Sequence, residues 1–230
     1  MYFQHAEALR SEYPDLVAAA ITTTGITAAA DVEEQVARFV AIAQTRLAGG
    51  TESDLAEIKA WRQAFSKMGL KPTQYRCASE ALLRRLRKEG GLPRIHPLID
   101  LCNAVSVAFA IPVAALDLDQ ITGDLEVRHA TGAEVYHTFG DTTEHPEPGE
   151  VIFADAAGLS HARRWTNRQS GLSAVRPTTS RVLIVAEALH ESAAEDVTAL
   201  MKTLVEELTA SWQAAPTAAV LSREAPRFTV

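Results

Sequence analysis

Apolar positions along the chain follow two spacings, which divide the sequence into a helical part, a strand-rich part and a last helix. The short apolar run from Leu16 to Thr22 predicts a first strand. After it, apolar residues recur every three or four positions, the spacing of amphipathic helices. Glycines and prolines close these segments, as is typical of helix ends. The predicted helices span residues 31–48, 52–68, 79–89 and 97–111.

From Pro112 to about Glu187 the pattern changes to short strand-like segments separated by Gly, Pro, Asp and Thr. DLEVRHA, AEVYHTF, GEVIFAD and RVLIVAEAL each have the length and composition of a strand. A last helix is expected from about Ser192 to Gln213. Helices on both sides of a strand-rich middle indicate an α+β fold. Because no repeat or Gly/Ser-rich linker interrupts the chain, residues 1–230 are interpreted as one domain.

Composition narrows the class of protein. The 230 residues are 47% hydrophobic and 22% charged, as in ordinary soluble domains. No apolar run is long enough to span a bilayer, and MYFQHAEALR lacks the basic start and apolar core of a secretory signal. Cys77 and Cys102 are too few for a disulfide scaffold and are interpreted as reduced thiols. We therefore expect a cytoplasmic protein.

The charges are segregated along the chain. The formal net charge is −7, yet residues 71–95 carry seven Lys or Arg against two acids, and residues 161–181 carry five Arg and no acid. This distribution suits a protein that binds a polyanion at one locus and repels it elsewhere. Two solvated basic faces on an acidic protein would give the same pattern. Arg84, Arg85 and Arg87 also complement the dipole of the helix that they close.

Two polar features interrupt apolar segments and are candidates for a site. Asp100, Asn103 and Ser106 lie three residues apart on the apolar helix that begins at Pro97, so they share one face. On a buried helix they need hydrogen bonds, either to neighbouring backbone or to a ligand in a pocket. Glu187 interrupts the strand VLIVAEAL, where an unpaired buried carboxylate is costly. It either pairs with an internal donor or faces a cavity where a ligand cation is its partner.

Metal and phosphate signatures are absent. The seven histidines are scattered, neither cysteine belongs to a ligand pair, and no metal or cofactor is predicted. GxGxxG, GxxxxGK[ST] and GxSxG do not occur. If the chain is an enzyme, its nucleophile is expected to be water or a group of the substrate.

The segment from Leu92 to Glu134 resembles a known family. It fits the motifs I-x-N-x-V-D-x-x-N-Y, G-x-P-x-H-A-F-D and G-x-I-x-V-R-x-A-x-x-G-E of the B3/B4 domain, the tRNA-editing domain of the bacterial phenylalanyl-tRNA synthetase beta subunit. The match extends over residues 92–189, and RRWTNRQS, WRQAF and YRCASEALLRRL resemble the family's free-standing branch. The matching residues are Ile95, Ile99, Asp100, Asn103, Pro112, Ala115, Asp117, Gly123, Leu125, Val127, Arg128, Ala130 and Glu134.

The resemblance implies a fold and an activity. The fold would be α+β, with a mixed β-sandwich-like core of unusual topology flanked by helices. The activity would be that of a trans-editing aminoacyl-tRNA deacylase, which hydrolyses the ester between a wrong amino acid and the 3′ end of a tRNA. Glu187 matches the glutamate that holds the amino end of the misattached residue. The family's histidine falls at Ala114 and its phenylalanine at Leu116, which puts a histidine-assisted step in doubt and suggests a different substrate side chain.

Site residues follow from this interpretation. Glu187, Asp100 and Asn103 are the catalytic candidates. Water, assisted by the terminal ribose hydroxyl of the tRNA, would attack the ester carbonyl. Arginine side chains or backbone N–H donors would stabilise the oxyanion that forms. Trp165 would stack on a splayed base; in the alternative interpretation it belongs to the core and some arginines pair with acids. The other predicted substrate contacts are Ser106, Ala114, Asp117, Asn167, Gln169 and Ser170, and the predicted tRNA contacts are Arg84, Arg85, Arg87, Arg163, Arg164 and Arg168.

The identity of the substrate stays open at this point. Free-standing relatives include deacylases that act on arginine tRNA misloaded with canavanine, whose guanidinium-like side chain would require acids in the pocket. Asp117, Asp119 and Asp155 lie near the matched motifs and could line it. A smaller or aromatic amino acid fits equally. The alternatives are a non-catalytic tRNA- or protein-binding module on the same fold and a small-molecule hydrolase that is indifferent to the tRNA body.

Overall fold

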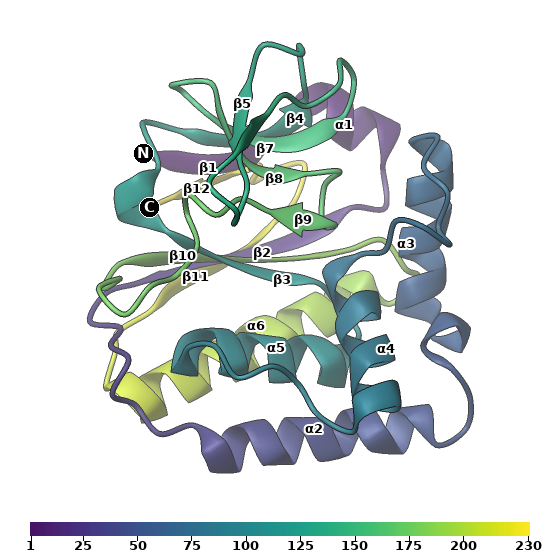
Figure 1. The fold of residues 1–230 in the computed structure, drawn as a ribbon, viewed down its shortest axis with the longest axis vertical. Coiled ribbons are helices and arrows are strands. Elements are labelled where there is room, and N and C mark those ends of the chain that lie inside the picture. The colour runs from purple at the N-terminus through teal and green to yellow at the C-terminus, as the bar shows by residue number, and fades with distance from the viewer.

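The computed structural model describes residues 1–230 as two stacked β-sheets with helices below and beside them (Figure 1). Sheet A has the strand order β12-β1-β4-β7-β8-β5-β6, with β9 paired to β8. Its strands are β1 (Tyr2–His5), β4 (Leu125–His129), β5 (Val135–His137), β6 (Thr143–Glu144), β7 (Val151–Asp155), β8 (Leu159–Arg163), β9 (Arg168–Gln169) and β12 (Arg227–Thr229). Sheet A is mixed, because β1 runs parallel to β4 and β5 runs parallel to β8.

Sheet B is smaller and entirely antiparallel, with the order β11-β2-β10-β3. Its strands are β2 (Val17–Thr23), β3 (Val113–Asp117), β10 (Val182–Ala188) and β11 (Thr217–Leu221). The two sheets and their helical cover confirm the predicted α+β class with a mixed, sandwich-like core.

The helices occupy three places around the sheets. The long helices α2 (Glu33–Leu47), α5 (Pro97–Phe109) and α6 (Ala193–Trp212) lie beneath sheet B, and α3 (Ala56–Lys67) and α4 (Ala78–Glu89) stand at one side of the sandwich (Figure 1). The short α1 (Glu7–Glu12) follows β1 and lies beside sheet A. Single 3-10 turns occur at Glu52–Asp54 and Leu118–Gln120. No helix has both the length and the apolar character needed to cross a membrane.

Strand alternation separates the interior into two cores. On β10, Val182, Ile184 and Ala186 face the helices and pack into a cluster with residues of α5 and α6. Leu183 and Val185 point the other way, into the cluster between the two sheets. Because side chains of a strand alternate between its faces, Glu187 shares the inter-sheet face with Leu183 and Val185. Its register in β10 therefore places a carboxylate between the sheets.

Most predicted elements are confirmed, and the missed ones are short strands and the six-residue helix α1. The strand near Leu16, five of the helices and the strands in DLEVRHA, GEVIFAD and RVLIVAEAL lie within a few residues of their predicted bounds. The sequence patterns did not predict the strands β1, β3, β6, β8, β9, β11 and β12. These missed strands complete both sheets, and β1 pairs with β12, which brings the two ends of the chain side by side (Figure 1).

Candidate functional site

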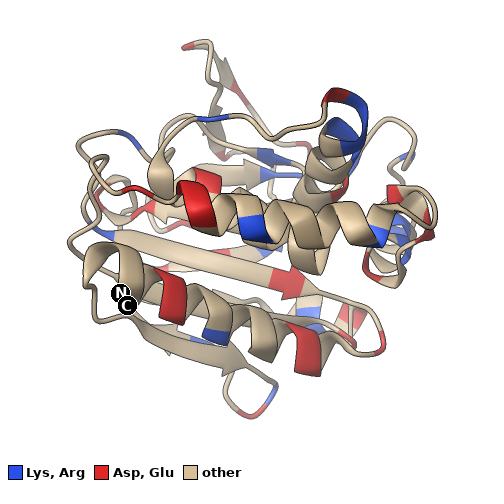
Figure 2. Cartoon of the chain, turned by 90° about the horizontal axis from the view of Figure 1, so that it is seen from below, with Lys and Arg blue, Asp and Glu red and all other residues tan.

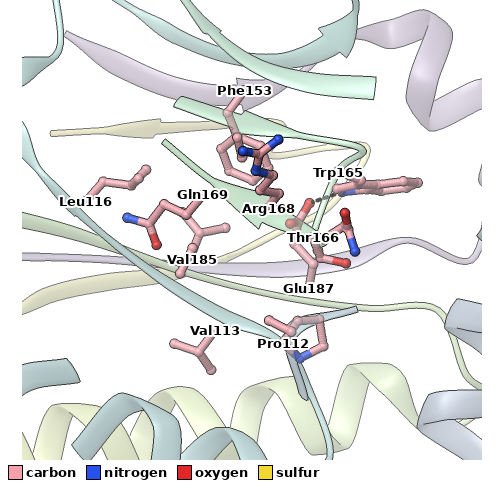
Figure 3. A pocket seen from close by; sticks show the side chains of 14 residues that line it. Pro112, Val113, Leu116, Phe153, Trp165, Thr166, Arg168, Gln169, Val185 and Glu187 are labelled. Atoms are coloured by element: carbon pink, nitrogen blue, oxygen red, sulfur yellow. Dashed lines mark hydrogen bonds between the residues drawn. The ribbon is translucent and has the colours of Figure 1, made fainter. Parts of the chain in front are cut away.

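A pocket opens between the two sheets at the β3 edge of sheet B (Figure 3). Its empty volume is about 480 Å³, including the space at its mouth. Strands β3 and β10 form its floor, β7 and β8 its roof, and the β8–β9 hairpin and the start of α4 its entrance. The lining residues are Ala78, Pro112, Val113, Ala114, Leu116, Phe153, Ala162, Trp165, Thr166, Asn167, Arg168, Gln169, Val185 and Glu187.

Glu187 is the one acid in this pocket, and its two oxygens have different surroundings. The residue is 2% exposed. Oε1 accepts hydrogen bonds from Trp165 Nε1 at 2.8 Å and from His5 Nε2 at 2.6 Å. Oε2 forms no hydrogen bond, although it is not sealed from solvent. The sequence left open whether Glu187 pairs internally or faces a cavity, and the structure shows that it does both.

His5 is a site residue that sequence reasoning missed. It lies on β1, next to Phe3 and buried to 2% exposure, and its Nδ1 has no partner. A carboxylate oxygen can only accept, so Nε2 must carry the hydrogen that bonds to Glu187. The alternation of Phe3 and His5 in YFQH was the available signal, but four residues are too few to distinguish a strand from a chain end.

Trp165 is a core residue, so its predicted stacking on a nucleobase is wrong. The indole is 0% exposed and packs edge-on against Trp61 and Tyr13, with ring centroids 4.9 Å apart in both pairs. An indole buried in this way satisfies its N–H with an internal acceptor. That acceptor is Glu187, so Trp165 orients the carboxylate and does not contact a base.

The turn that carries Trp165 has a left-handed backbone. Arg164 and Trp165 have φ angles of 49° and 59°, which cost a residue with a side chain about 1–2 kcal/mol each. Two hydrogen bonds hold the turn: Trp165 N donates to Val151 O at 2.7 Å, and Arg164 N donates to Glu150 Oε1 at 3.0 Å. This conformation points the indole inward and leaves Thr166 and Asn167 at the pocket entrance. Strained backbone of this kind is found most often at functional sites.

The polar atoms that remain free in the pocket are mostly acceptors. Asn167 uses its amide nitrogen to bond Arg76 O at 2.8 Å, and Gln169 uses its own to bond Ala115 O at 2.8 Å. With the nitrogens fixed on backbone, the side-chain oxygens of both amides form no hydrogen bond. Thr166 Oγ1 also has no partner. Since Thr166 Oγ1 is sealed from solvent, the acceptors open to a ligand are Glu187 Oε2 and the two amide oxygens, which suit a ligand that carries several N–H donors.

Three predicted residues on α5 lie outside the pocket. Asp100 accepts a hydrogen bond from Ile95 N at 2.8 Å and pairs with Arg94, so it fixes the start of the helix. Ser106 Oγ donates to Ile111 O at 2.6 Å and fixes its end. Asn103 forms no side-chain hydrogen bond and does not line the pocket. Of the two roles that the sequence allowed for this stripe, the structure shows the fixing of neighbouring backbone at Asp100 and Ser106.

The acids considered for a cationic substrate also lie elsewhere. Asp117 accepts from Thr179 Oγ1 at 2.6 Å and from Asp119 N at 3.0 Å, on the helical side of sheet B. Asp155 caps the β7–β8 turn through the backbone of Ala157 and Leu159. Ser170, a predicted substrate contact, is 0% exposed and donates to His137 O. None of them lines the pocket.

Most arginines of the two basic segments are paired with acids. Arg163 is buried and bonds Glu150 and Glu144, so its predicted phosphate contact is wrong. Arg168 shares Glu144, Arg84 and Arg87 both approach Glu52, and Arg85 pairs with Glu89. Arg164 forms no ion pair; its guanidinium lies 4.9 Å from the centre of the Tyr75 ring. Basic and acidic positions alternate along α2 and α6, whereas basic positions gather at the end of α4 (Figure 2).

The two basic segments nevertheless meet at the pocket entrance. Ala78 N, in the first turn of α4, donates to Thr166 O at 2.8 Å, and Asn167 bonds the backbone of Arg76. The Arg164–Tyr75 stack joins them a third time. Segments about 90 residues apart in the sequence thus form one wall beside Glu187.

One cluster of potential metal ligands lies outside the pocket. Glu57, His190 and Asp196 place ligand atoms within 4.8 Å of one another. Each acid already has an internal partner, because Glu57 pairs with Arg46 and Asp196 accepts from His190 and Ser192. The cluster is therefore explained by ion pairs and hydrogen bonds.

Comparison with known proteins decides the family. A family model described as the B3/4 domain matches residues 60–203. The chain belongs to the B3/4 domain family. The match covers all of α4, α5 and β10, and therefore contains every strand and helix that lines the pocket.

Relatives of this B3/4 domain are subunits of a much longer enzyme. It is 32% identical over 117 residues to the phenylalanine–tRNA ligase beta subunit of Shewanella oneidensis, which is 50% of this chain and 14% of the subunit. It is 33% identical over 78 residues to that of Corynebacterium jeikeium, 34% of this chain and 9% of the subunit. An N-terminal fragment of the phenylalanyl-tRNA synthetase beta subunit from Pyrococcus horikoshii has the same fold, with a TM-score of 0.50 at 11% identity over 93% of this chain and 49% of the fragment.

Proposed function

We propose that this chain is a trans-editing deacylase that hydrolyses the ester bond of a mischarged aminoacyl-tRNA. The observation that carries the proposal is the state of Glu187. One of its oxygens is saturated by Trp165 and His5, and the other is free in a pocket. A carboxylate with one oxygen fixed by internal donors and the other accessible from a pocket is suited to bind the ammonium group of an amino acid ester. The B3/4 family membership and the resemblance to the tRNA-editing domain favour the same role.

The pocket's free acceptors favour a substrate rich in N–H donors. Beside Glu187 Oε2, the oxygens of Asn167 and Gln169 face a cavity whose remaining walls are mainly apolar. An α-ammonium would bind Glu187, and a second donor group on the side chain could bind the two amides. Canavanine, with its guanidinium-like end, has this distribution, so canavanyl-tRNA for arginine is our first candidate.

Hydrolysis would proceed without a covalent enzyme intermediate. The pocket contains no cysteine, lysine or serine, and His5 lies behind Glu187. A water molecule would form a bond to the ester carbonyl carbon, the bond from that carbon to the ribose oxygen would break, and the ribose oxygen would take up the proton. The chain's contribution is to position the ester, because a well-oriented reaction can gain several kcal/mol from proximity alone. Ala114, where the family motif has histidine, leaves the adjacent wall small.

The tRNA would approach along the wall where the two basic segments meet. Arg164 has no carboxylate partner there and already stacks on Tyr75, so it could exchange that contact for a phosphate or a terminal base. Arg168, 42% exposed at the pocket entrance, is the second candidate. The partners we propose are therefore the aminoacyl end and the last nucleotides of a tRNA.

A deacylation panel tests the proposal. The purified chain is incubated with tRNAs that carry correct and incorrect amino acids, including canavanine on arginine tRNA, and loss of the ester is followed. Selective acceleration for one mischarged pair is expected. Glu187→Gln should lower that rate by about 100-fold, the usual effect of removing one charged transition-state contact, while binding of uncharged tRNA is retained.

Two comparisons make the panel specific. Glu126→Gln, on β4 and bonded to Gln4, is a matched control outside the pocket and should keep the wild-type rate. Esters of the same amino acid on a short mimic of the tRNA end should react much more slowly, which a small-molecule hydrolase would not show. Unaltered ester half-lives across the panel, with uncharged tRNA still bound, would favour the non-catalytic binding module instead.

A further inference from the structure

Arg10 on α1 is a buried guanidinium without a partner. The residue is 3% exposed, and its side chain forms no hydrogen bond or ion pair. Nε and Nη2 are sealed from solvent and unbonded. The third nitrogen, Nη1, is equally unbonded but is not sealed. The nearest charged influences on it are Glu187, Glu7 and Arg223, none close enough to bond it.

This arrangement is costly unless something binds there. A buried charge is normally paired and hydrogen-bonded, because loss of its hydration is worth several kcal/mol. Removal from water also lowers the pKa of Arg10, although an arginine stays protonated under all ordinary conditions. The other deeply buried arginine of this chain, Arg163, has all of its partners. Arg10 therefore differs from Arg163 in lacking the hydrogen-bond partners that a buried arginine normally has.

Arg10 lines a second pocket, on the opposite edge of the sandwich from the first. This pocket lies at the β11 edge of sheet B and has an empty volume of about 690 Å³. Tyr13, whose hydroxyl is also buried and unpartnered, lines it, as do Arg223 and Ser222. Its single acid, Glu224, already accepts a hydrogen bond from Ser222 Oγ. The free polar groups are thus donors, the reverse of the pocket at Glu187.

We propose that this second pocket binds a small oxoanion, a phosphate or a carboxylate, on Arg10. Nη1, the one nitrogen of Arg10 that is not sealed, can donate a charge-assisted hydrogen bond to such a group, and the negative charge of the group compensates the buried guanidinium. Arg223 at the rim adds positive charge. An apolar ligand would leave the charge uncompensated, and a cation would be repelled. The two pockets share no lining residue, and the proposal for the second does not rest on the proposed deacylase function, although Tyr13 of the second pocket packs against Trp165 of the first.

The test is the melting temperature of the whole chain as a function of added anion. Sodium phosphate and sodium malonate are titrated separately at pH 7.5, with sodium chloride adjusted to hold the ionic strength constant. A ligand that binds only the folded chain raises the melting temperature in a saturable way. About 3 °C is expected at ten times the half-saturating concentration. The anion with the larger rise identifies the class.

Variants of Arg10 show whether the anion-dependent increase in melting temperature requires its guanidinium. Arg10→Met should abolish it, and Arg10→Lys, which keeps the charge but cannot place a nitrogen where Nη1 lies, should shift half-saturation to at least tenfold higher concentration. Arg227→Met is the matched control, because Arg227 is an exposed arginine that lies over Tyr2, and it should respond like the wild type. No rise with either anion, or an equal rise in Arg10→Met, overturns the proposal. Should Arg10→Met fail to fold, the Lys variant alone decides.

Discussion

Arg163 and Arg10 are two arginines of nearly equal burial with opposite surroundings. Arg163 is 5% exposed and Arg10 is 3% exposed. Arg163, on β8, donates from Nε and Nη2 to the two oxygens of Glu150 at 2.9 and 2.7 Å and from Nη1 to Glu144 at 2.6 Å. Arg10, on α1, donates to nothing.

The difference separates structural charge from charge available for binding. Arg163 lies in the most basic stretch of the sequence, yet its charge is neutralised by ion pairs with Glu150 and Glu144 that hold the β8–β9 hairpin. Arg10 lies in a stretch with acids on both sides, Glu7 and Glu12, but its guanidinium forms no ion pair. An excess of basic residues in one stretch of sequence therefore does not identify the arginines that are free to bind an anion. Those arginines are identified by the ion-pair and hydrogen-bond partners that each one has in the folded structure.

The largest effect expected from this comparison is on folding stability. Arg163→Met removes the buried cation of an ion-pair network and should lower the free energy of unfolding by about 3–5 kcal/mol, because Glu150 is left with backbone N–H donors only. Arg10→Met breaks no hydrogen bond and removes an uncompensated buried charge, so in anion-free buffer it should not lower the free energy of unfolding and should raise it. Urea unfolding at pH 7 measures both.

A variant that keeps the charge at the first position sharpens the test. Arg163→Lys can still meet one carboxylate, so its loss should fall between those of the two methionine variants. Similar losses for Arg10→Met and Arg163→Met would mean that Arg10 is held by internal partners, contrary to the comparison.

The next effect concerns Glu187, the acid that lines the first pocket. Trp165→Phe keeps most of the ring packing but removes the N–H that bonds Oε1, and should cost about 1–3 kcal/mol of stability. Combined with Glu187→Gln in a double-mutant cycle, the two changes should couple by about 1 kcal/mol or more, since they share one hydrogen bond. Strict additivity would contradict the view that the indole orients this carboxylate.

Much of the fold could be predicted because long periodic segments carry their own signal. The five longer helices and the apolar strand β10 follow from spacing, glycine and proline alone. The missed strands β1, β3, β6, β8, β9, β11 and β12 are two to five residues long. In such short segments alternation is hardly visible, and pairing with neighbours rather than local pattern decides the structure.

The candidate site could be predicted only in part. Glu187 was recognisable as a charge within an apolar strand, and Asn167, Arg168 and Gln169, which were predicted as substrate or tRNA contacts, line the same pocket. His5 could not be placed, because its partner lies 182 residues away. The stacking role predicted for Trp165 failed because two consecutive left-handed residues turn the indole inward, which nothing in RRWTNRQS indicates.

A smaller effect is the pH dependence of the Arg163 network. Burial alone would raise the pKa of Glu150, but the hydrogen bonds and charge of Arg163 outweigh it and hold the pKa below its usual value. The stabilisation is therefore complete above the ordinary carboxyl pKa of about 4.3 and is lost as the pH falls through the lower folded-state value. Wild type should lose about 1 kcal/mol more than Glu150→Gln between pH 6 and pH 3, measured by urea unfolding. Parallel pH curves for the two proteins would contradict this.

The smallest effect separates two arginines of the same hairpin. Arg164 has no acid partner, whereas Arg168 shares Glu144 with Arg163. If the chain binds tRNA at the pocket entrance, Arg164→Ala should reduce the slope of log affinity against log salt by about 0.7–0.9, the value of one released counterion, and weaken binding about threefold. Arg168→Ala should change the slope by less than half of that, because its charge is already compensated. Stability should change by no more than about 1 kcal/mol in either variant, so a loss of binding reports on contact and not on unfolding. If both variants reduce the slope of log affinity against log salt equally, an arginine that pairs with a surface glutamate is still able to bind RNA. The distinction drawn from Arg163 and Arg10 would then hold only for buried side chains.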